Sequence, residues 1–172
     1  DLEIAVIDEQ RGLGNGRLLP SGPLREPAKR LDSVDVKVMT RRTRASHQPP
    51  TSANAIIATP VHGDAISLGA GERRSLQSFI GTRVHAIAGI GNPRAFFDAL
   101  SELGLTVEPH PLPDLAGLTA ADLAFPDGAP VLMTEKDAVK CRSGADASRL
   151  ANCWAVRLDV AMSEADTQAI HR

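Results

Sequence analysis

Short apolar runs alternate with helical patterns along the second half of the chain, and this rhythm constrains the fold more than any other feature of the sequence. Runs rich in β-branched residues are typical of strands, and apolar residues spaced three and four apart are typical of helices. The pattern predicts strands at 84–90, 106–110, 130–133 and 154–160, with helices at 93–103, 120–125 and 135–141 between them. Strands that alternate with helices form layers around a mainly parallel sheet, so the predicted fold class is α/β.

The first half of the chain contains a second, less regular set of predicted elements. Residues 2–7 (LEIAVI) have the composition of a buried strand in a parallel sheet, and residues 34–39 (VDVKVM) read as another strand. Further predictions are one helical turn at 28–31, weak strands at 55–59 and 65–68, and a short helix near 72–80. Because the chain begins without methionine and enters a strand at once, we expect it to be a fragment of a longer protein.

Residues 40–54 are the best candidate for a linker. The segment is polar and basic, and Pro49-Pro50 interrupts it. Its arginines Arg41, Arg42 and Arg44 are expected to be solvated, the alternative being a surface for anionic lipid head groups. The prediction therefore divides the chain into residues 1–39, a linker at 40–54, and an α/β lobe at 55–172.

The sequence contains recognisable capping residues at two helix starts, each of which directly follows a predicted strand. Asn92 can cap the helix that Pro93 opens, because proline lacks the donor that a first turn leaves unpaired. Thr134 can accept from the next helix while Asp137 reaches back as a capping box. Ligands of open α/β sheets bind at the carboxyl ends of strands. The segment 88–93 (AGIGNP) is therefore either an anion site of helix N–H groups or a tight, well-capped turn.

Composition and charge exclude several classes of function. The net charge of −2 gives no case for nucleic-acid binding, which needs a clustered basic surface. No apolar run approaches the roughly 20 residues that span a bilayer. The cysteines Cys141 and Cys153 have no metal-like spacing, and no pair of histidines forms an H-E-x-x-H motif. The phosphate-loop pattern G-x-x-x-x-G-K-[ST] does not occur in the 172 residues either.

The segment 11–27 (RGLGNGRLLPSGPLREP) is the most unusual stretch of the chain. Glycines let a backbone approach a ligand closely, and the guanidinium groups of Arg17 and Arg25 could clamp phosphate through a planar fork of donors. Glu26 could hold a hard cation such as magnesium. From composition alone, the alternative reading is a surface loop whose glycines merely permit turns.

This segment also carries a resemblance. RGLGNGRLLP followed by GPLREP resembles the signature of the tetraacyldisaccharide 4′-kinase family. The resemblance continues in residues 84–97 (VHAIAGIGNPRAFF) and 130–141 (PVLMTEKDAVKC), in the family's order and with comparable spacing. Residues 1–8 (DLEIAVID) resemble the strand that leads into the loop, whereas residues 40–68 and the last twenty or so match poorly.

The resemblance implies a fold, an activity and partners. The fold is the end of a P-loop-NTPase-like parallel sheet followed by a smaller C-terminal α/β lobe, so residues 1–39 would be the end of the kinase core. The family transfers the γ-phosphate of ATP to the 4′-hydroxyl of a tetraacylated glucosamine disaccharide 1-phosphate, giving lipid IVA, a precursor of lipid A. It requires Mg²⁺ and works at the cytoplasmic face of the inner membrane of Gram-negative bacteria.

The resemblance also implies which residues take part. Arg25 and Glu26 match an active-site Arg-Glu pair, with Glu26 linked to magnesium. Beside the resemblance, Arg17 in the first loop and Asn92 in the 88–93 turn are the candidates for substrate binding. The phosphate loop, the catalytic aspartate and the segment credited with membrane attachment would precede residue 1. We therefore expect the 172-residue chain alone to be inactive, because that loop normally holds the β- and γ-phosphates.

One departure from the family pattern leaves an alternative open. The family normally has Asp-His-His where this chain reads Asp114-Leu115-Ala116. The two replaced histidines favour a non-catalytic module that binds a nucleotide or an anionic glycolipid. The intact Arg25-Glu26 pair favours the kinase.

Overall fold

The structure is a computed structural model, and it describes residues 2–9, 11–41, 55–113, 118, 122–142 and 150–170. The chain divides into two compact units by its internal contacts. The first unit comprises Asp1–Val61 together with Val160–Arg172, and the second unit comprises His62–Asp159.

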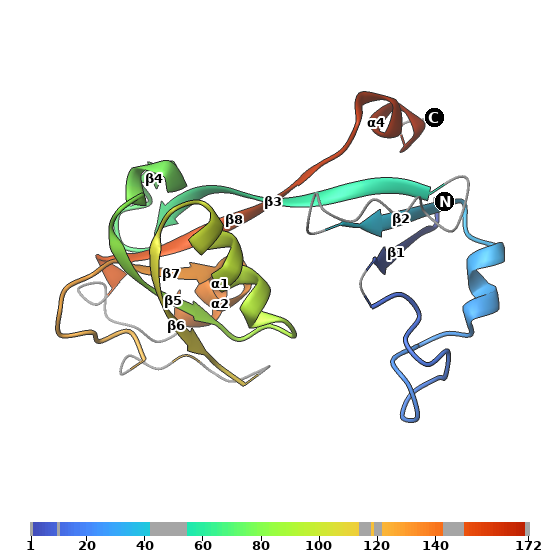
Figure 1. The fold of residues 1–172 in the computed structure, drawn as a ribbon, viewed down its shortest axis with the longest axis horizontal. Coiled ribbons are helices and arrows are strands. Elements are labelled where there is room, and N and C mark those ends of the chain that lie inside the picture. The colour runs from blue at the N-terminus through green and yellow to red at the C-terminus, as the bar shows by residue number, and fades with distance from the viewer. Residues whose placement is uncertain are drawn as a thin grey trace. The chain divides into compact units, whose positions relative to one another are not determined.

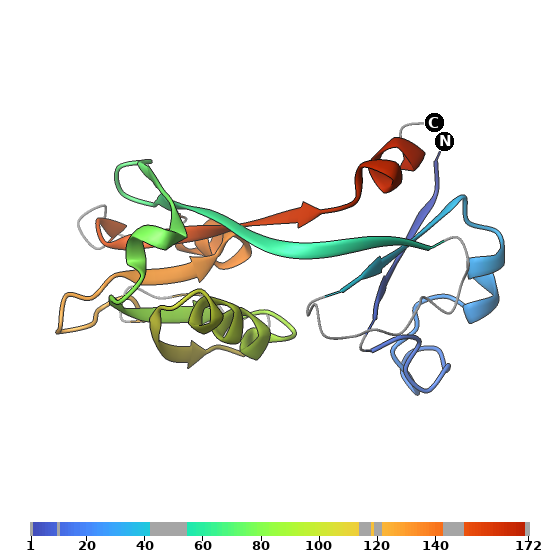
Figure 2. The ribbon, with the colours of Figure 1, turned by 45° about the horizontal axis from the view of Figure 1, so that its top comes forward.

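The first unit is built on parallel strands. Strand β1 (Ile4–Asp8) pairs with β2 (Val36–Thr40), and β2 pairs in turn with the beginning of β3 (Ala55–Ser67). Figure 2 shows the long blue loop that leaves β1 and returns through the 3₁₀ helix η1 (Ala28–Asp32) to β2. The small core of the first unit contains Val38, Ile56 and Ala58, and Met162 and Ile170 pack against it.

The second unit holds the rest of the sheet, in the order β3-β8-β7-β5-β6 (Figure 1). Strand β5 (Arg83–Ala88) runs parallel to both β6 (Thr106–Pro111) and β7 (Val131–Thr134), and β7 runs parallel to β8 (Cys153–Ala161). The short strand β4 (Arg73–Arg74) pairs antiparallel with β3. The predicted α/β class with a mainly parallel sheet is therefore confirmed.

The two faces of β5 are covered by different elements, because successive side chains of a strand point to opposite faces. Val84, Ala86 and Ala88 pack in one cluster with the apolar side of helix α1 (Pro93–Glu102). Ile87 belongs to a second cluster, which includes side chains of β7 and of helix α2 (Glu135–Arg142). Because these β5 side chains are at most 1% exposed, the prediction of a buried strand here is confirmed.

Three predicted elements differ from the structure. The two weak strands at 55–59 and 65–68 are one continuous strand, β3. Gly63 lies inside this strand, and a β-carbon there would overlap an Asp159 carboxylate oxygen on β8. The helix near 72–80 is instead β4 followed by the 3₁₀ helix η2 (Leu76–Phe79).

The helix predicted at 120–125 falls partly outside the described residues, and residues 122–125 form a turn and irregular structure rather than a helix. At the other end of the chain, helix α4 (Glu164–Ile170) was not predicted.

The predicted division into 1–39, 40–54 and 55–172 stays a prediction, since residues 42–54 lie outside the described part of the chain. The compact units divide elsewhere, at 61/62 and again at 159/160. The physical reason is strand pairing. Ala55 to Ala58 pair residue by residue with Lys37 to Thr40, which ties the start of β3 to the first unit.

Candidate functional site

The loop after β1 begins with a series of tight turns that its alternating glycines make possible. Gly12, Gly14 and Gly16 have φ angles of +51°, +60° and +71°, in the left-handed region that other residues rarely adopt. Each glycine N–H closes a turn, the first donating to the Asp8 carbonyl at 2.8 Å. The glycines are therefore explained by backbone geometry, without a ligand.

The loop then folds back on itself and brings Arg17 beside the start of the Arg25-Glu26 segment. Leu18 pairs with Leu24, and the Leu24 N–H donates to the Arg17 carbonyl at 3.2 Å. The Asn15 side chain ties the turn together, since its oxygen accepts from the Arg17 N–H at 3.1 Å and its amide donates to the Ser21 carbonyl at 2.9 Å. Arg17 and Arg25 are thus carried by one internally bonded loop.

Gly22 is the position where this loop tolerates a side chain least. A β-carbon there would overlap both the Asn15 side-chain oxygen and the Arg17 carbonyl, whereas a β-carbon at Gly12 meets no atom within 4 Å. We expect Gly22→Ala to open the loop and make it cleavable by trypsin at Arg17 or Arg25 under native conditions. Gly12→Ala, the matched control, should strain the backbone without opening the fold-back. Equal cleavage rates in the two variants would contradict this.

Arg25 and Glu26 are both exposed, and they differ in their partners. The Glu26 carboxylate lies 3.3 Å from Arg30 Nε, and Arg30 also pairs with Glu3. These carboxylates, Glu3 foremost, raise the pKa of Arg30. Among the described residues, no carboxylate pairs with the Arg25 guanidinium. Arg25 can therefore meet an anionic ligand without first losing an internal ion pair.

The expectation of a solvated Arg41 is wrong. Its guanidinium binds the Glu9 carboxylate through Nη2 at 2.7 Å and Nε at 3.0 Å, and both side chains are largely covered. This hydrogen bonding raises the pKa of Arg41 despite the opposing effect of its burial. The ion pair links Arg41, which follows β2, to Glu9, which follows β1. Arg42 and Arg44 lie outside the described residues.

In the second unit, Asp137 joins the two strand-end turns singled out in the sequence. Its side chain is fully buried, and Oδ2 accepts from the Gly89 N–H at 2.9 Å and the Thr134 hydroxyl at 2.7 Å. Lys140 Nζ lies 3.0 Å from Oδ1. Burial by itself would raise the pKa of Asp137, but the Gly89 N–H, Thr134 and Lys140 outweigh it and lower that pKa.

The predicted capping box is thus half right. The Thr134 hydroxyl accepts from the Asp137 N–H at 3.2 Å, as expected. The Asp137 carboxylate, however, accepts from the Thr134 hydroxyl and from Gly89 on the neighbouring strand end. The predicted anion site at 88–93 consequently already has one of its N–H groups bound to an internal carboxylate.

The structure brings three of the four predicted site residues into the same loop and places the fourth elsewhere. Arg17, Arg25 and Glu26 belong to the first unit, and Asn92 belongs to the second. The Asn92 side-chain oxygen accepts from the Ala95 N–H at 3.3 Å, so the predicted helix cap is confirmed. Asp114, Leu115 and Ala116 lie outside the described residues.

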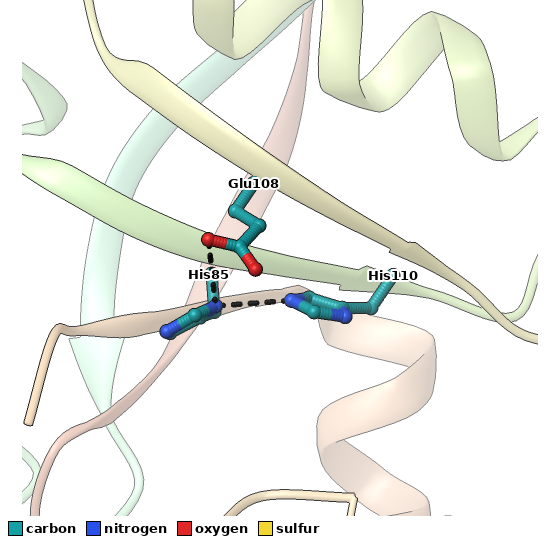
Figure 3. Close-up of side chains that lie close together, drawn as sticks. All are labelled: His85, Glu108 and His110. Atoms are coloured by element: carbon teal, nitrogen blue, oxygen red, sulfur yellow. Dashed lines mark hydrogen bonds and ion pairs between the residues drawn. The ribbon is translucent and has the colours of Figure 1, made fainter. Parts of the chain in front are cut away.

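Sequence reasoning missed one cluster of chemically capable side chains, which lies on β5 and β6. His85, Glu108 and His110 offer ligand atoms that all lie within 4.8 Å of one another (Figure 3). The available signal was the Glu-x-His alternation of 108–110, because residues two apart share one face of a strand. His85 lies far from residues 108–110 in the sequence and is brought to them only by the pairing of β5 with β6.

Within the described ranges, no helix combines the length and apolar character that a membrane crossing requires.

Comparison with known proteins gives a consistent result. The model of the family described as Tetraacyldisaccharide-1-P 4'-kinase matches residues 1–172. Tetraacyldisaccharide 4'-kinase of Pseudomonas aeruginosa is 48% identical over 166 residues, which cover 96% of this chain and 47% of that protein. The enzyme of the same name from Nitrosococcus oceani is 44% identical over 163 residues, covering 94% of this chain and 44% of that protein.

Among solved structures, the crystal structure of LpxK from Aquifex aeolicus in complex with ATP is similar, with a TM-score of 0.67. Its sequence is 22% identical, and the match covers 99% of this chain and 52% of that one. This likeness concerns the fold. The chain spans about half the length of the curated relatives it matches.

Proposed function

The chain belongs to the tetraacyldisaccharide-1-P 4'-kinase family, and we propose that it takes part in transferring the γ-phosphate of ATP to the 4′-hydroxyl of tetraacyldisaccharide 1-phosphate. The product, lipid IVA, is an intermediate of lipid A biosynthesis. The single observation that carries this proposal is the family match over residues 1–172, which includes the loop with Arg25 and Glu26.

Arg25 is proposed to contact a phosphate group of ATP or of the lipid. The loop that carries Arg25 follows the carboxyl end of β1, and α/β sheets bind ligands at that edge. Arg25 is exposed, and hydrogen bonds within the loop hold its backbone. Phosphoryl transfer depends mostly on positioning and charge stabilisation. A guanidinium held in place before the reaction suits both. Arg17, on the same loop, and Asn92 are proposed to contact the substrate.

Glu26 is proposed to hold Mg²⁺ or to orient Arg25. Magnesium prefers oxygen ligands such as carboxylates. The side chain of Glu26 is 67% exposed, so its carboxylate is accessible to the ion. Arg30 competes for the same carboxylate. When bound, the ion would neutralise charge that develops on the phosphates.

The proposed location is the cytoplasmic face of the bacterial inner membrane, where the protein would be peripheral. The support is the substrate that the relatives' name specifies, because a tetraacylated disaccharide is held in a membrane by its acyl chains.

A second candidate is a module that binds a nucleotide or an anionic glycolipid without turnover. Leu115 and Ala116, which stand where the family has histidines, favour it. Both candidates predict that the protein binds its nucleotide or glycolipid ligand, but only the kinase predicts transfer of phosphate to the lipid.

A chimera distinguishes the two candidates. This chain replaces the 166-residue region that it matches in the P. aeruginosa kinase, and the purified chimera is incubated with radiolabelled ATP and the disaccharide 1-phosphate. We expect labelled lipid from the chimera and none from the 172-residue chain alone, which contains no phosphate-loop pattern. A folded chimera that binds ATP without labelling the lipid would favour the binding module. Turnover by the chain alone would contradict the assignment of the phosphates to a loop outside it.

A further inference from the structure

The pairing of β5 with β6 gathers chemically capable side chains on one face of the second unit. His85 lies directly opposite Glu108 in the parallel register, and His110 follows Glu108 by two residues on the same face. Figure 3 shows the three side chains converging between the two strands. None of them belongs to the proposed kinase loop.

The hydrogen bonds of His85 fix which of its two ring nitrogens carries the proton and which carries the lone pair. Nε2 lies 3.0 Å and 3.1 Å from the two oxygens of Asp127. Because a carboxylate only accepts, Nε2 carries the proton, and the lone pair is therefore on Nδ1. That Nδ1 accepts a hydrogen bond from His110 Nε2 at 3.0 Å and lies 3.9 Å from Glu108 Oε2. A bound ion would replace this hydrogen bond once the His110 proton has moved to the other nitrogen of its ring. Phe125 stacks on the His85 ring at 3.7 Å and restricts its rotation.

We propose that His85 Nδ1, His110 Nε2 and a Glu108 carboxylate oxygen form a site for a divalent ion of the zinc type. Two imidazoles and one carboxylate are a ligand set that zinc favours, with a solvent molecule completing the tetrahedron. Asp127 orients His85 in the way that carboxylates orient metal-bound histidines. The site does not depend on the proposed kinase function, and its test requires no kinase assay.

The distances fit such an ion after a small adjustment. Two nitrogens that bind one tetrahedral zinc at about 2.0–2.1 Å are separated by about 3.3 Å. The observed 3.0 Å between the imidazole nitrogens therefore needs to open by only a few tenths of an ångström. A rotation of the partly exposed Glu108 side chain brings its carboxylate closer. A pocket of about 400 Å³ adjoins the cluster at His110 and is lined in part by that residue and Phe125.

Arg83 is the group that opposes metal binding. Its guanidinium pairs with Glu108 and lies 3.6 Å from Asp127 Oδ2. It therefore competes for Glu108 and adds positive charge beside the site. Both contacts of Arg83 with Glu108 are to Oε2, the oxygen that lies 3.9 Å from His85 Nδ1, so Oε1 is the oxygen that remains for the ion after the side chain rotates. Removing the Arg83 charge should consequently strengthen metal binding.

The test is a titration of the purified 172-residue chain, first stripped with a chelator, with Zn²⁺ alone and with Co²⁺ alone. We expect one ion per chain with micromolar or tighter affinity, a rise in thermal midpoint, and visible absorption typical of tetrahedral Co²⁺. No binding below millimolar zinc would overturn the proposal.

Variants separate this site from other places where zinc could bind. His110→Ala and Glu108→Gln should each weaken binding at least about tenfold, and Asp127→Asn by about tenfold to a hundredfold through the lost orientation of His85. Arg83→Gln should tighten binding. Because Glu108 is partly exposed, Glu108→Gln remains informative if His110→Ala fails to fold.

The matched control is the double variant His47→Ala, His171→Ala, which removes the two histidines outside the described residues and should bind zinc like the parent. Burial raises the pKa of the Cys141 and Cys153 thiols to about 11, so they should compete poorly at neutral pH. Zinc binding that survives both His110→Ala and Glu108→Gln, or that is lost in the control, would assign the ion elsewhere and overturn the proposal.

Discussion

Arg25→Ala should lower kcat/KM of the chimera about a hundredfold while leaving its thermal midpoint nearly unchanged. Loss of a preorganised group that stabilises charge in the transition state costs about 3 kcal/mol, which corresponds to this factor. The fold should survive because Arg25 is exposed and, among the described residues, has no ion-pair partner. Steady-state kinetics with ATP and the disaccharide 1-phosphate measures the first effect, and thermal unfolding measures the second.

Glu26→Ala should cause a loss that approaches the same size if Glu26 holds magnesium or orients Arg25. This variant also removes the ion pair with Arg30, so a small change of thermal midpoint is expected. Raising the magnesium concentration should restore part of its activity, and should not restore the activity of Arg25→Ala.

Lys29→Ala is the matched control for the loss of a cation. Lys29 is exposed and lies four residues beyond Arg25 in the same unit. Its removal should leave kcat/KM within about twofold, a difference of only about 0.4 kcal/mol. Arg41→Ala is unsuitable as a neutral control, because Arg41 is tied to Glu9. If Arg25→Ala and Lys29→Ala have equal effects, Arg25 has no special place in the reaction.

Asp137→Ala should destabilise the second unit by about 3 kcal/mol, because it leaves the buried Gly89 N–H without its acceptor and the Lys140 ammonium without its partner. A loss of this size is a large share of the roughly 5–15 kcal/mol that stabilises a domain. Trp154, the chain's only tryptophan, is buried in the core of this unit. Its fluorescence during urea unfolding therefore reports the effect directly.

The stability that Asp137 confers should also depend on pH. Its pKa is lower in the folded than in the unfolded chain, so its contribution is fully present above the unfolded value of about 3.9. The contribution is lost as the pH falls through the lower folded value. The difference between parent and Asp137→Ala should thus be constant near neutral pH and shrink in acid.

Asp137→Asn is the informative comparison, since it keeps an acceptor for Gly89 and loses the charge that faces Lys140. It should lie between the parent and Asp137→Ala. An alanine variant as stable as the parent at pH 7 would show that these hydrogen bonds contribute no net stability.

The sequence predicted most strands and helices of the second unit because local patterns determine them, the helices expected near 72–80 and at 120–125 being the exceptions. Val84, Ala86 and Ala88 are apolar on one face of β5 and Ile87 is apolar on the other, with His85 as the exception, which suits a central parallel strand. Asn92-Pro93 and Thr134 mark helix starts through contacts a few residues away. The sequence could not predict contacts between segments that lie far apart in the chain. The bond from Gly89 to Asp137, for example, joins residues 48 positions apart.

The same limit applies to the candidate sites. The glycines of the first loop are accounted for by their φ angles, so composition alone could not distinguish a ligand loop from a set of turns. The resemblance to a family supplied Arg25 and Glu26. His85 and His110 are 25 residues apart, and only the register of β5 and β6 brings their rings together.

The most direct test of the central claim is phosphate transfer by the chimera. Transfer of label from γ-labelled ATP to the 4′ position of tetraacyldisaccharide 1-phosphate, located by mass spectrometry of the product, should occur with kcat/KM within about tenfold of the P. aeruginosa enzyme, a difference of about 1.4 kcal/mol. Substitution of Arg25 should abolish most of that transfer. A folded chimera that binds ATP and the lipid, yet transfers no label, would contradict the assignment of this chain to a working 4′-kinase.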